Sequence, residues 1–364
     1  MENLVVLIKP SSSLCNSSCT YCFYKDIKSC NDAKFMSFAT MEKLIDEVFL
    51  IKNLKNVTFC FQGGEPLLIG IEFYKEFINY ADANKSNILV SYSLQTNGIL
   101  IDREFCRFFK ENNFLIGISL DGIRETHNKN RFLNNTGTGS FDTVYNKIKL
   151  VERYGINFNI LCVITKSLSE QVLEVYNFFK KEHFPYIQYI ACLSLINKDS
   201  SGCSVKDFKK FYSDLFNVWL QDLKKGIYTS INLFDDIILL FRNQNPMGCG
   251  MCGNCSLQCV VESDGSIYPC DFYVNDNYCL GNINEVSLDK LLSGERAVSF
   301  MKEKNSLPKI CYNCKFKGIC NGGCKRQRHT FVDDAVCGKK VVYELIYKNY
   351  SEIENALYNI NVRG

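Results

Sequence analysis

Short apolar runs alternate with amphipathic stretches along the N-terminal half of the chain. Runs rich in β-branched and aromatic residues are typical of buried strands, whereas apolar residues at helical spacing indicate helices that pack on one face. We expect strands at 5–8, 57–61, 88–94, 115–120, 158–164 and 187–190. We expect helices at 41–49, 73–83, 103–110, 141–154 and 168–181. This alternation predicts parallel βαβ units and therefore an α/β barrel, open or closed.

A change in pattern divides the rest of the chain. Residues 205–242 have mainly helical periodicity, and we expect the only tryptophan, Trp219, to pack there on an apolar face. Beyond residue 246 the chain is rich in glycine and cysteine and has few long periodic segments, so we expect metal to stabilise its fold. The domain prediction is a barrel at 1–200, a helical connection at 201–245, a cysteine-rich domain at 246–340 and a C-terminal helix at 341–364.

Cysteine is the unusual component, because the 364 residues include 20 Cys but only 3 His. The N-terminus has no secretory signal, and no apolar run approaches the roughly 18 residues that span a membrane, so we expect a cytoplasmic protein without a membrane partner. Clustered cysteines in the cytosol more often bind metal than form disulfides. With so few histidines, they favour iron–sulfur clusters or four-cysteine zinc sites. The net charge of +3 gives no reason to expect nucleic acid as a partner.

The first chemical motif follows the first predicted strand. Cys15, Cys19 and Cys22 have C-x3-C-x2-C spacing within CNSSCTYC. Three thiolates hold three irons of a [4Fe–4S] cluster and leave the fourth iron open to another ligand, which is a catalytic arrangement. A zinc knuckle or three unrelated thiols is the alternative. The segment FQGGEP ends the second strand, where its glycines allow the backbone to approach a ligand closely and Glu65 adds a charge. Both motifs lie where α/β barrels carry their active sites.

A second group of cysteines lies in the last third of the chain. It includes a C-x2-C-x5-C-x3-C run that begins at Cys311, and two earlier thiols with five residues between them. The candidate ligands are Cys249, Cys255, Cys270, Cys311, Cys314, Cys320, Cys324 and Cys337. Eight thiolates suffice for two fully ligated [4Fe–4S] clusters or for two four-cysteine zinc sites. The N-terminal motif favours iron–sulfur.

Together these motifs resemble those of the radical S-adenosylmethionine (SAM) enzymes. The resemblance implies a partial (β/α)6 TIM-type barrel, in which the three N-terminal cysteines hold a [4Fe–4S] cluster and SAM binds its open iron. The GGE segment would lie along the methionine part of SAM. Reduction would cleave SAM to a 5′-deoxyadenosyl radical that abstracts a substrate hydrogen.

The C-terminal part resembles the SPASM domain, which carries two auxiliary iron–sulfur clusters in radical SAM enzymes that modify peptides and proteins. The resemblance implies three [4Fe–4S] clusters in all. The implied ligands of the first auxiliary cluster are Cys249, Cys255, Cys270 and Cys324, and those of the second are Cys311, Cys314, Cys320 and Cys337. Cys252, Cys259 and Cys279 have no counterpart role.

Within this class the chain is similar to the anaerobic sulfatase-maturating enzymes, through segments such as LIKPSSSLC, CTYCFY, SLQTNG and VVESDGSIYPCDFY. These enzymes oxidise an active-site Cys or Ser of a sulfatase to Cα-formylglycine. The resemblance implies SAM contacts at five positions and a catalytic base at Asp271. The implied SAM contacts are Tyr21, Gly64, Ser119, Arg131 and Leu193. The implied partners are a sulfatase segment C/S-x-P-x-R and an electron donor such as flavodoxin or ferredoxin.

Two other functions remain as hypotheses. The first is a radical SAM maturase that crosslinks a ribosomally made peptide through sulfur or carbon. The cluster motif begins at Cys15 and leaves no room for a leader-recognition domain ahead of it, which favours the sulfatase substrate. The second is a non-catalytic scaffold on four-cysteine zinc sites, which the open three-cysteine motif disfavours. The segment SLINKDSSGCSV at 194–205 matches no known pattern, and we expect it to border the substrate channel.

Overall fold

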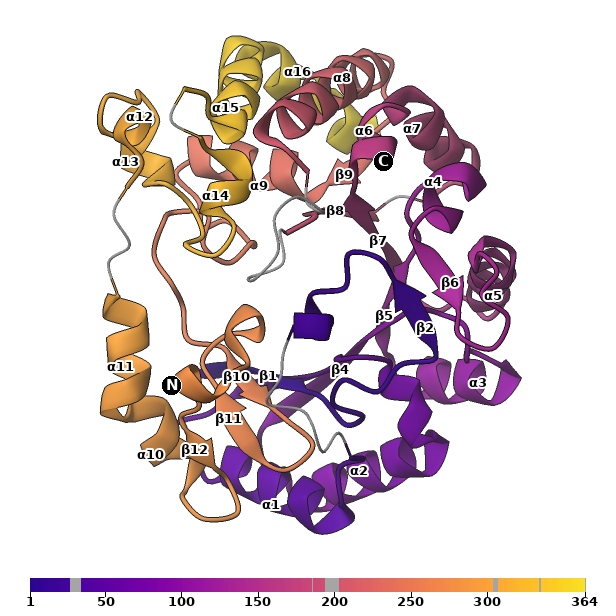
Figure 1. The fold of residues 1–364 in the computed structure, drawn as a ribbon, viewed down its shortest axis with the longest axis vertical. Coiled ribbons are helices and arrows are strands. Elements are labelled where there is room, and N and C mark those ends of the chain that lie inside the picture. The colour runs from indigo at the N-terminus through magenta and orange to yellow at the C-terminus, as the bar shows by residue number, and fades with distance from the viewer. Residues whose placement is uncertain (27–33, 185, 194–202, 304–306, 334, 364) are drawn as a thin grey trace. The chain divides into compact units, whose positions relative to one another are not determined.

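The computed structural model describes residues 1–26, 34–184, 186–193, 203–303, 307–333 and 335–363 (Figure 1). These residues form two compact units, each built from several stretches of the chain. The first unit contains residues 1–119, 131–158 and 257–303, and the second contains residues 120–130, 159–256 and 304–364.

A mixed sheet forms the centre of the first unit. Its strand order is β12-β11-β10-β1-β3-β4-β5. The strands are β1 (Asn3–Ile8), β3 (Asn56–Phe61), β4 (Leu89–Thr96), β5 (Leu115–Ser119), β10 (Cys259–Val261), β11 (Ser266–Tyr268) and β12 (Gly281–Asn282). The five strands from β10 to β5 run parallel, whereas β11 and β12 are antiparallel to their neighbours. The sheet is open, in agreement with a partial rather than a closed barrel.

The strand β1 has the alternation of buried and exposed residues from which a strand can be predicted. Leu4, Val6 and Ile8 are buried while Val5 is 54% exposed, which is the alternation expected of a strand with one covered face. On one side β1 pairs with β3, and on the other it pairs in parallel with β10, a strand from the cysteine-rich part of the chain. The three residues of β10 are too few to show a period, so the sequence did not predict it.

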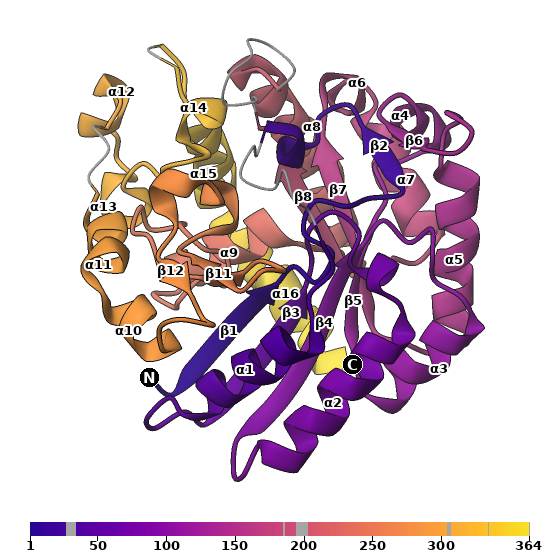
Figure 2. The same cartoon turned by 60° about the horizontal axis from the view of Figure 1, so that its bottom comes forward.

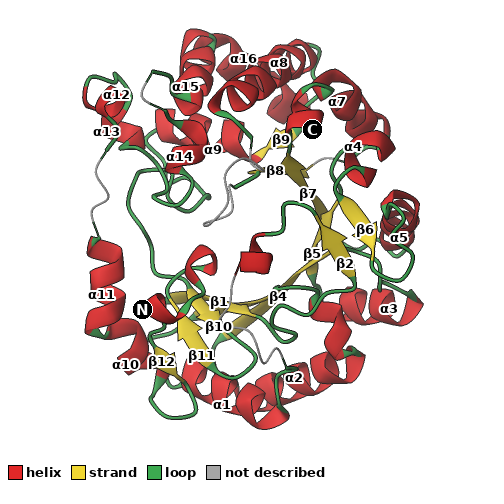
Figure 3. Ribbon diagram, in the orientation of Figure 1, coloured by secondary structure: helices red, strands yellow, loops and turns green. Residues whose placement is uncertain are grey.

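Helices cover the sheet face that lies away from β2 (Ser17–Cys19) and the short 3-10 helix η1 (Phe23–Asp26), as Figures 2 and 3 show. The helices of the first unit are α1 (Phe38–Phe49), α2 (Ile71–Asn84), α3 (Arg103–Glu111), α5 (Phe141–Arg153), α10 (Leu288–Ser293) and α11 (Glu295–Lys302). Side-chain caps fix two of their starts, because Ser37 accepts a hydrogen bond from Thr40 N and Asp102 accepts from Glu104 N. The core between sheet and helices is aromatic: the rings of Phe59 and Phe77 lie 4.9 Å apart.

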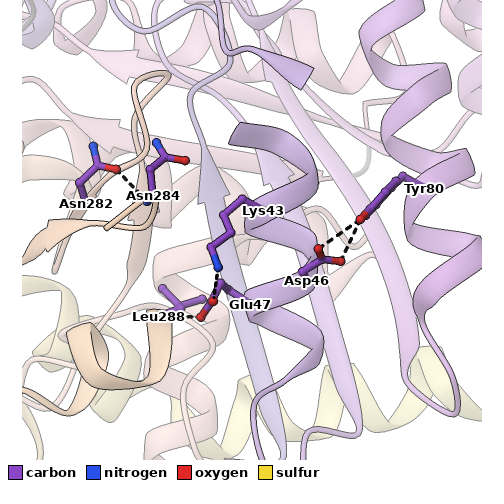
Figure 4. A network of polar contacts seen from close by, with 7 residues as sticks. All are labelled: Lys43, Asp46, Glu47, Tyr80, Asn282, Asn284 and Leu288. Atoms are coloured by element: carbon purple, nitrogen blue, oxygen red, sulfur yellow. Dashed lines mark hydrogen bonds and ion pairs between the residues drawn. The ribbon is translucent and has the colours of Figure 1, made fainter. Parts of the chain in front are cut away.

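A polar network anchors the stretch 257–303 to the N-terminal helices (Figure 4). Glu47 on α1 pairs with Lys43 at 2.7 Å and accepts a hydrogen bond from Leu288 N, at the start of α10, at 2.9 Å. Tyr80 on α2 donates to Asp46 on α1 at 3.1 Å. The turn after β12 is closed locally, since Asn282 Oδ1 accepts from the main-chain N–H of the residue two positions on. The C-terminal addition to the sheet is therefore held at both its strand and its helix.

The second unit has a parallel three-stranded sheet of β7 (Phe158–Ile164), β8 (Tyr186–Ala191) and β9 (Ser230–Ile231). Its helices are α4 (Arg124–Asn128), α6 (Lys166–Ser169), α7 (Val172–Lys181), α8 (Val205–Lys224), α9 (Asn232–Phe241), α12 (Lys309–Tyr312), α13 (Lys317–Cys320), α14 (Arg328–Phe331), α15 (Gly338–Lys348) and α16 (Tyr350–Arg363). Trp219 on α8 is fully buried against Phe234 and donates to Thr229 O at 2.9 Å, which confirms its expected packing role.

The predicted elements of the N-terminal half are confirmed with shifts of a few residues at their ends. One prediction was wrong in part: the helix expected at 168–181 is two helices, α6 and α7, because Gln171 between them leaves the helical conformation at φ −125° and ψ 34°. Among the described residues, no helix has both the length and the apolar character required to cross a membrane.

Candidate functional site

The three N-terminal cysteines lie on one short segment of the first unit. Cys15 follows the loop after β1, Cys19 ends β2, and Cys22 directly precedes η1. All three are partly exposed, and the main-chain N–H of Cys22 donates to Cys19 O at 3.4 Å. Burial raises the pKa of the Cys15 thiol to about 11, and negative charge at Glu65, Cys19 and Cys22 adds to this rise. The segment therefore brings the three thiols within electrostatic reach of one another.

The glycines of FQGGEP support this cysteine segment from the end of β3. Gly64 N donates to Ser12 O at 2.8 Å, and Glu65 N donates to Leu14 O at 2.7 Å. A Cβ at Gly64 would clash with Leu14 O and lie 2.7 Å from Ser13 O. In the structure the close backbone approach at Gly64 is made to the chain's own loop before Cys15, and only glycine permits it. The predicted approach to a ligand stays a prediction.

Glu65 itself is fully buried and links the ends of β3 and β4. Its Oε1 accepts from the Thr96 hydroxyl at 2.8 Å and from Leu67 N at 3.0 Å, and its Oε2 accepts from Asn97 N at 2.8 Å. Burial raises the pKa of this carboxyl to about 7, although the three hydrogen bonds oppose the rise. Glu65 therefore links the ends of β3 and β4 through buried hydrogen bonds.

Asn97 connects Glu65 to the cysteine segment. Its side-chain Nδ2 lies 3.7 Å from Cys15 Sγ and 2.8 Å from Asn16 Oδ1. Its Oδ1 accepts from Ile99 N at 2.9 Å. The segment 95–98 was expected at the active-site end of the predicted strand 88–94, but no role was predicted for Asn97 within it.

Two of the candidate SAM contacts, Tyr21 and Arg131, lie close to Cys19. The strands β2 and β6 (Arg131–Leu133) pair antiparallel, with Cys19 opposite Arg131. The buried Arg131 places Nη1 3.9 Å from Cys19 Sγ and its guanidinium 5.5 Å from the centre of the Tyr21 ring. Ser119 ends β5 and is half-buried. Leu193 belongs to the second unit, where its buried side chain follows β8.

A buried charge centre surrounds Asp271, the candidate base. Lys9, at the end of β1, is fully buried, and its Nζ lies 2.8 Å from Asp271 Oδ1 and 3.5 Å from Glu262 Oε1. Tyr24 donates its hydroxyl to Asp271 Oδ1 at 3.0 Å, and Lys9 Nζ lies 4.5 Å from the Tyr24 ring centre. Burial and the charge of Asp271 raise the pKa of Tyr24 well above its ordinary value, so this phenol stays a donor.

This centre joins segments that are far apart in the sequence. Lys9 comes from the N-terminal strand, Tyr24 from η1, and Asp271 from the 3-10 helix η4 (Asp271–Tyr273) after β11. The rings of Phe23 and Phe272 pack edge to face at 5.5 Å and hold η1 beside η4. No role was predicted from the sequence for Lys9, Tyr24 or Glu262. A signal was present for Lys9 alone, a charge directly after the predicted strand 5–8, whereas Glu262 follows β10, which was not predicted.

Four C-terminal cysteines share one pocket of the second unit. Cys311, Cys314, Cys320 and Cys337 line it, together with Phe316, Lys317, Gly322, Val332, Lys339, Lys340 and Tyr343. Burial raises the pKa of the Cys337 thiol to about 11, and the other three thiols add to the rise. Cys337 Sγ also accepts from Lys340 N at 3.4 Å at the start of α15.

Three of the four remaining candidate ligands also belong to the second unit. These are Cys249, Cys255 and Cys324, whereas Cys270 belongs to the first unit, directly before Asp271. Gly250, at φ +71°, lets the loop after Cys249 approach Cys324, because a Cβ there would lie 2.8 Å from Cys324 Cβ. Residues 194–202 of the segment expected to border the substrate channel lie outside the described residues.

The chemistry of these donors fits iron–sulfur clusters. The pocket shared by Cys311, Cys314, Cys320 and Cys337 presents four thiols, which is the ligand set of one [4Fe–4S] cluster.

Comparison with protein families places two models on the chain. Residues 10–179 match the radical SAM superfamily, and residues 249–315 match an iron–sulfur cluster-binding domain named SPASM.

Known proteins similar to the chain carry related names. A cysteine-type anaerobic sulfatase-maturating enzyme of Clostridium novyi is 43% identical over 337 residues, which cover 90% of this chain and 89% of that protein. A serine-type anaerobic sulfatase-maturating enzyme of Bacteroides thetaiotaomicron is 30% identical over 372 residues, which cover 96% of this chain and 89% of that protein. The solved structure described as native anSMEcpe with bound AdoMet is 37% identical, with a TM-score of 0.88, and the match covers 98% of this chain and 100% of that one.

Proposed function

Because the chain belongs to the radical SAM superfamily, and within it to the anaerobic sulfatase-maturating enzymes, we propose that it oxidises an active-site cysteine of a sulfatase to Cα-formylglycine. The observation that carries this proposal is the 43% identity to a cysteine-type enzyme over 90% of the chain. The identity to a serine-type enzyme is lower, at 30%, which supports cysteine as the preferred target residue. A structure described as anSMEcpe with AdoMet and the Cp18Cys peptide, 36% identical to this chain, supports a polypeptide substrate.

The family uses [4Fe–4S] clusters, and the donor set of this chain fits them. We assign the cluster that binds SAM to Cys15, Cys19 and Cys22. We assign the two auxiliary clusters to Cys249, Cys255, Cys270 and Cys324, and to Cys311, Cys314, Cys320 and Cys337. When bound, the N-terminal cluster and SAM supply a 5′-deoxyadenosyl radical that removes a hydrogen atom from the substrate Cβ. Because the chain belongs to the radical SAM enzymes, the hypothesis of a non-catalytic zinc scaffold is excluded.

The residues around Cys19 are the candidate SAM contacts. Arg131 supplies a guanidinium that matches a carboxylate, and its position 3.9 Å from Cys19 Sγ supports a role in binding the carboxylate of SAM. Tyr21, 5.5 Å from that guanidinium, adds an aromatic face. Gly64, Ser119 and Leu193 complete the proposed set.

Asp271 is the proposed base for the thiol proton of the substrate. In the described part of the chain its side-chain bonds go to Oδ1, from Lys9 at 2.8 Å and from Tyr24 at 3.0 Å. The two donors fix the carboxylate and leave Oδ2 to accept a proton. The CH2–SH unit becomes a C=S bond when it loses one hydrogen atom to the deoxyadenosyl radical, one proton to Asp271 and one electron, which the neighbouring auxiliary cluster would accept. Water converts that bond to the aldehyde and releases hydrogen sulfide.

The reaction can be tested on two peptides that differ in one atom. With SAM, a low-potential reductant and a C-x-P-x-R peptide under anaerobic conditions, we expect 5′-deoxyadenosine and a peptide aldehyde that reacts with a hydrazine. The matched S-x-P-x-R peptide should react more slowly. Replacement of Cys15, Cys19 and Cys22 by Ala is the control and should abolish both products. Crosslinked peptide without aldehyde would instead establish the peptide-maturase alternative. Flavodoxin and ferredoxin are the proposed physiological donors, and either should replace the chemical reductant.

A further inference from the structure

We propose that Asn97 sets the reduction potential of the N-terminal cluster through an N–H···S hydrogen bond to Cys15. The inference rests on the proposed function, because it takes Cys15 as a cluster ligand. It assigns to Asn97 a positioning role through a cluster ligand, distinct from contact with SAM or substrate.

The geometry of Asn97 gives the bond its direction. The side-chain amide has two hydrogens, and Nδ2 has two acceptors in reach: Asn16 Oδ1 at 2.8 Å and Cys15 Sγ at 3.7 Å. The longer distance is suitable for sulfur, whose radius exceeds that of oxygen. One amide group therefore serves an oxygen and a ligand sulfur at the same time.

The surroundings of Asn97 fix which end of the amide faces the sulfur. Asn97 Oδ1 accepts from Ile99 N at 2.9 Å, so the carbonyl end is already used on the opposite side. The main-chain N–H of Asn97 donates to Glu65 Oε2 at 2.8 Å, and Glu65 is fully buried. Asn97 is 9% exposed. The amide is thus held in place by its own hydrogen bonds and is almost completely buried.

A donor at this position favours the reduced cluster. Reduction adds an electron whose charge spreads over the cluster and its thiolates, so the hydrogen bond to Cys15 strengthens on reduction. Limited access to water makes that difference larger than at an exposed thiolate. Loss of the donor should therefore lower the reduction potential. A hydrogen bond to a charged acceptor contributes enough to change the reduction equilibrium about tenfold, which corresponds to about 59 mV for one electron.

The chain offers a matched control. Asn134 Nδ2 donates to the carbonyl oxygen of the same Cys15 at 2.9 Å, and Ser18 donates to its Oδ1 at 2.8 Å. Asn134 thus has the same side chain and touches the same cysteine, but at the main chain instead of the sulfur. A general disturbance of the cysteine segment would follow either substitution, whereas loss of the N–H···S bond follows only a change at Asn97.

The experiment is a redox titration of the reconstituted holoenzyme, followed by electron paramagnetic resonance. The signal that changes on addition of SAM reports the N-terminal cluster, and the variant with Cys15, Cys19 and Cys22 all replaced by Ala identifies the auxiliary signals. We expect Asn97→Ala to lower the potential of the SAM-sensitive signal by about 59 mV, as a tenfold change. Asn97→Asp keeps an acceptor for Ile99 N, and it should lower the potential at least as far. Asn134→Ala should leave it unchanged.

The outcomes separate this inference from the proposed function. If the wild-type protein has no SAM-sensitive signal, the proposed function is wrong and this inference with it. If the signal is present and both Asn97 variants keep the wild-type potential, only the role of Asn97 is overturned. The same holds if Asn134→Ala shifts the potential as much as Asn97→Ala. Should Asn97→Ala lose the cluster, the measurement on Asn97→Asp decides the question.

Discussion

Lys9 is a fully buried ammonium between two carboxylates, Asp271 and Glu262. A buried ion is costly unless it is paired, so the three groups depend on one another. Removal of the cation leaves two carboxylates close together without their shared partner. The centre around the candidate base is therefore a source of stability only while all of its members are present.

We expect Lys9→Met to lower the free energy of unfolding by about 3–5 kcal/mol, because it breaks a buried ion pair. Denaturant unfolding of the cluster-free protein measures this. Lys55→Met is the control, since Lys55 pairs with Glu2 at the surface, where its side chain is 65% exposed, and such pairs contribute about 1 kcal/mol or less. Equal losses in the two variants would show that Lys9 gains nothing from its burial among acids.

Asp271→Asn keeps the shape of the side chain and removes its basicity. We expect this variant to bind its irons and to cleave SAM, yet to form about a hundredfold less formylglycine, which is the usual contribution of general-base catalysis. The ratio of aldehyde to 5′-deoxyadenosine is the measurement. Asp276→Asn, at an exposed acid in the 3-10 helix η5 (Asp276–Tyr278), is the control and should keep the wild-type ratio. A wild-type ratio in Asp271→Asn would exclude Asp271 as the base.

Glu65 gives the protein a pH dependence of known sign. Its pKa is about 7 in the folded state against an ordinary 4.5, so the folded state holds this proton over a range in which the unfolded state has lost it. Stability should therefore fall as pH rises from about 4.5 to about 7, by roughly 3 kcal/mol for this group. In Glu65→Gln this contribution should vanish. The free energy of unfolding should therefore depend less steeply on pH than in wild type, whereas the two proteins should differ less in stability at low pH.

Unfolding of the cluster-free proteins at pH 5.5 and pH 8 tests this expectation. Glu72→Gln is the control, because Glu72 has a side chain that is 74% exposed. It should retain the wild-type slope. Parallel pH profiles for wild type and Glu65→Gln would mean that Glu65 is already ionised in the folded protein at pH 5.5.

At the scale of elements, the sequence predicted the strands that are long enough to show a hydrophobic pattern. The strands β1, β3, β4, β5, β7 and β8 are apolar runs long enough to show burial. The strands β2, β6 and β10 have three residues each, so their pairing depends on partners elsewhere in the chain and not on their own composition. The same limit hid the pairing of Cys19 with Arg131. The family resemblance supplied Arg131 as a SAM contact, but it did not supply this pairing.

The turn between β3 and the 3-10 helix η3 (Pro66–Ile69) should be intolerant of any side chain at Gly64. A Cβ in Gly64→Ala would meet the main chain of Ser13 and Leu14, which cannot rotate away as a flexible side chain would. We expect the loop before Cys15 to shift and the protein to lose about four irons per chain. Iron analysis after anaerobic reconstitution measures this. Gly318→Ala is the control, since nothing lies within 4 Å of its Cβ position. Full iron content in Gly64→Ala would disprove the role of this contact.

At the scale of the whole molecule, the candidate base and its partners come from opposite ends of the sequence. Asp271 was identified through a family resemblance, but Lys9 and Tyr24 were not, because no local pattern links residues so far apart. The two cysteine-rich regions could be located from spacing alone. The support of the N-terminal region by Glu65, Asn97 and Gly64 depends on hydrogen bonds and close contacts that exist only in the folded chain.

The parallel pairing of β10 with β1 has a consequence for biosynthesis. Until residues 259–261 leave the ribosome, β1 is an open sheet edge with unpaired main-chain groups, and Lys9 has neither of its acids. A nascent chain that stops at residue 245 should therefore be prone to aggregate and should not fold on its own. Many N-terminal domains, in contrast, fold first during synthesis. Expression of residues 1–245 should yield aggregates. The edge of β1 stays unpaired until almost three quarters of the chain has been made. Chaperones would have to shield this edge during that interval.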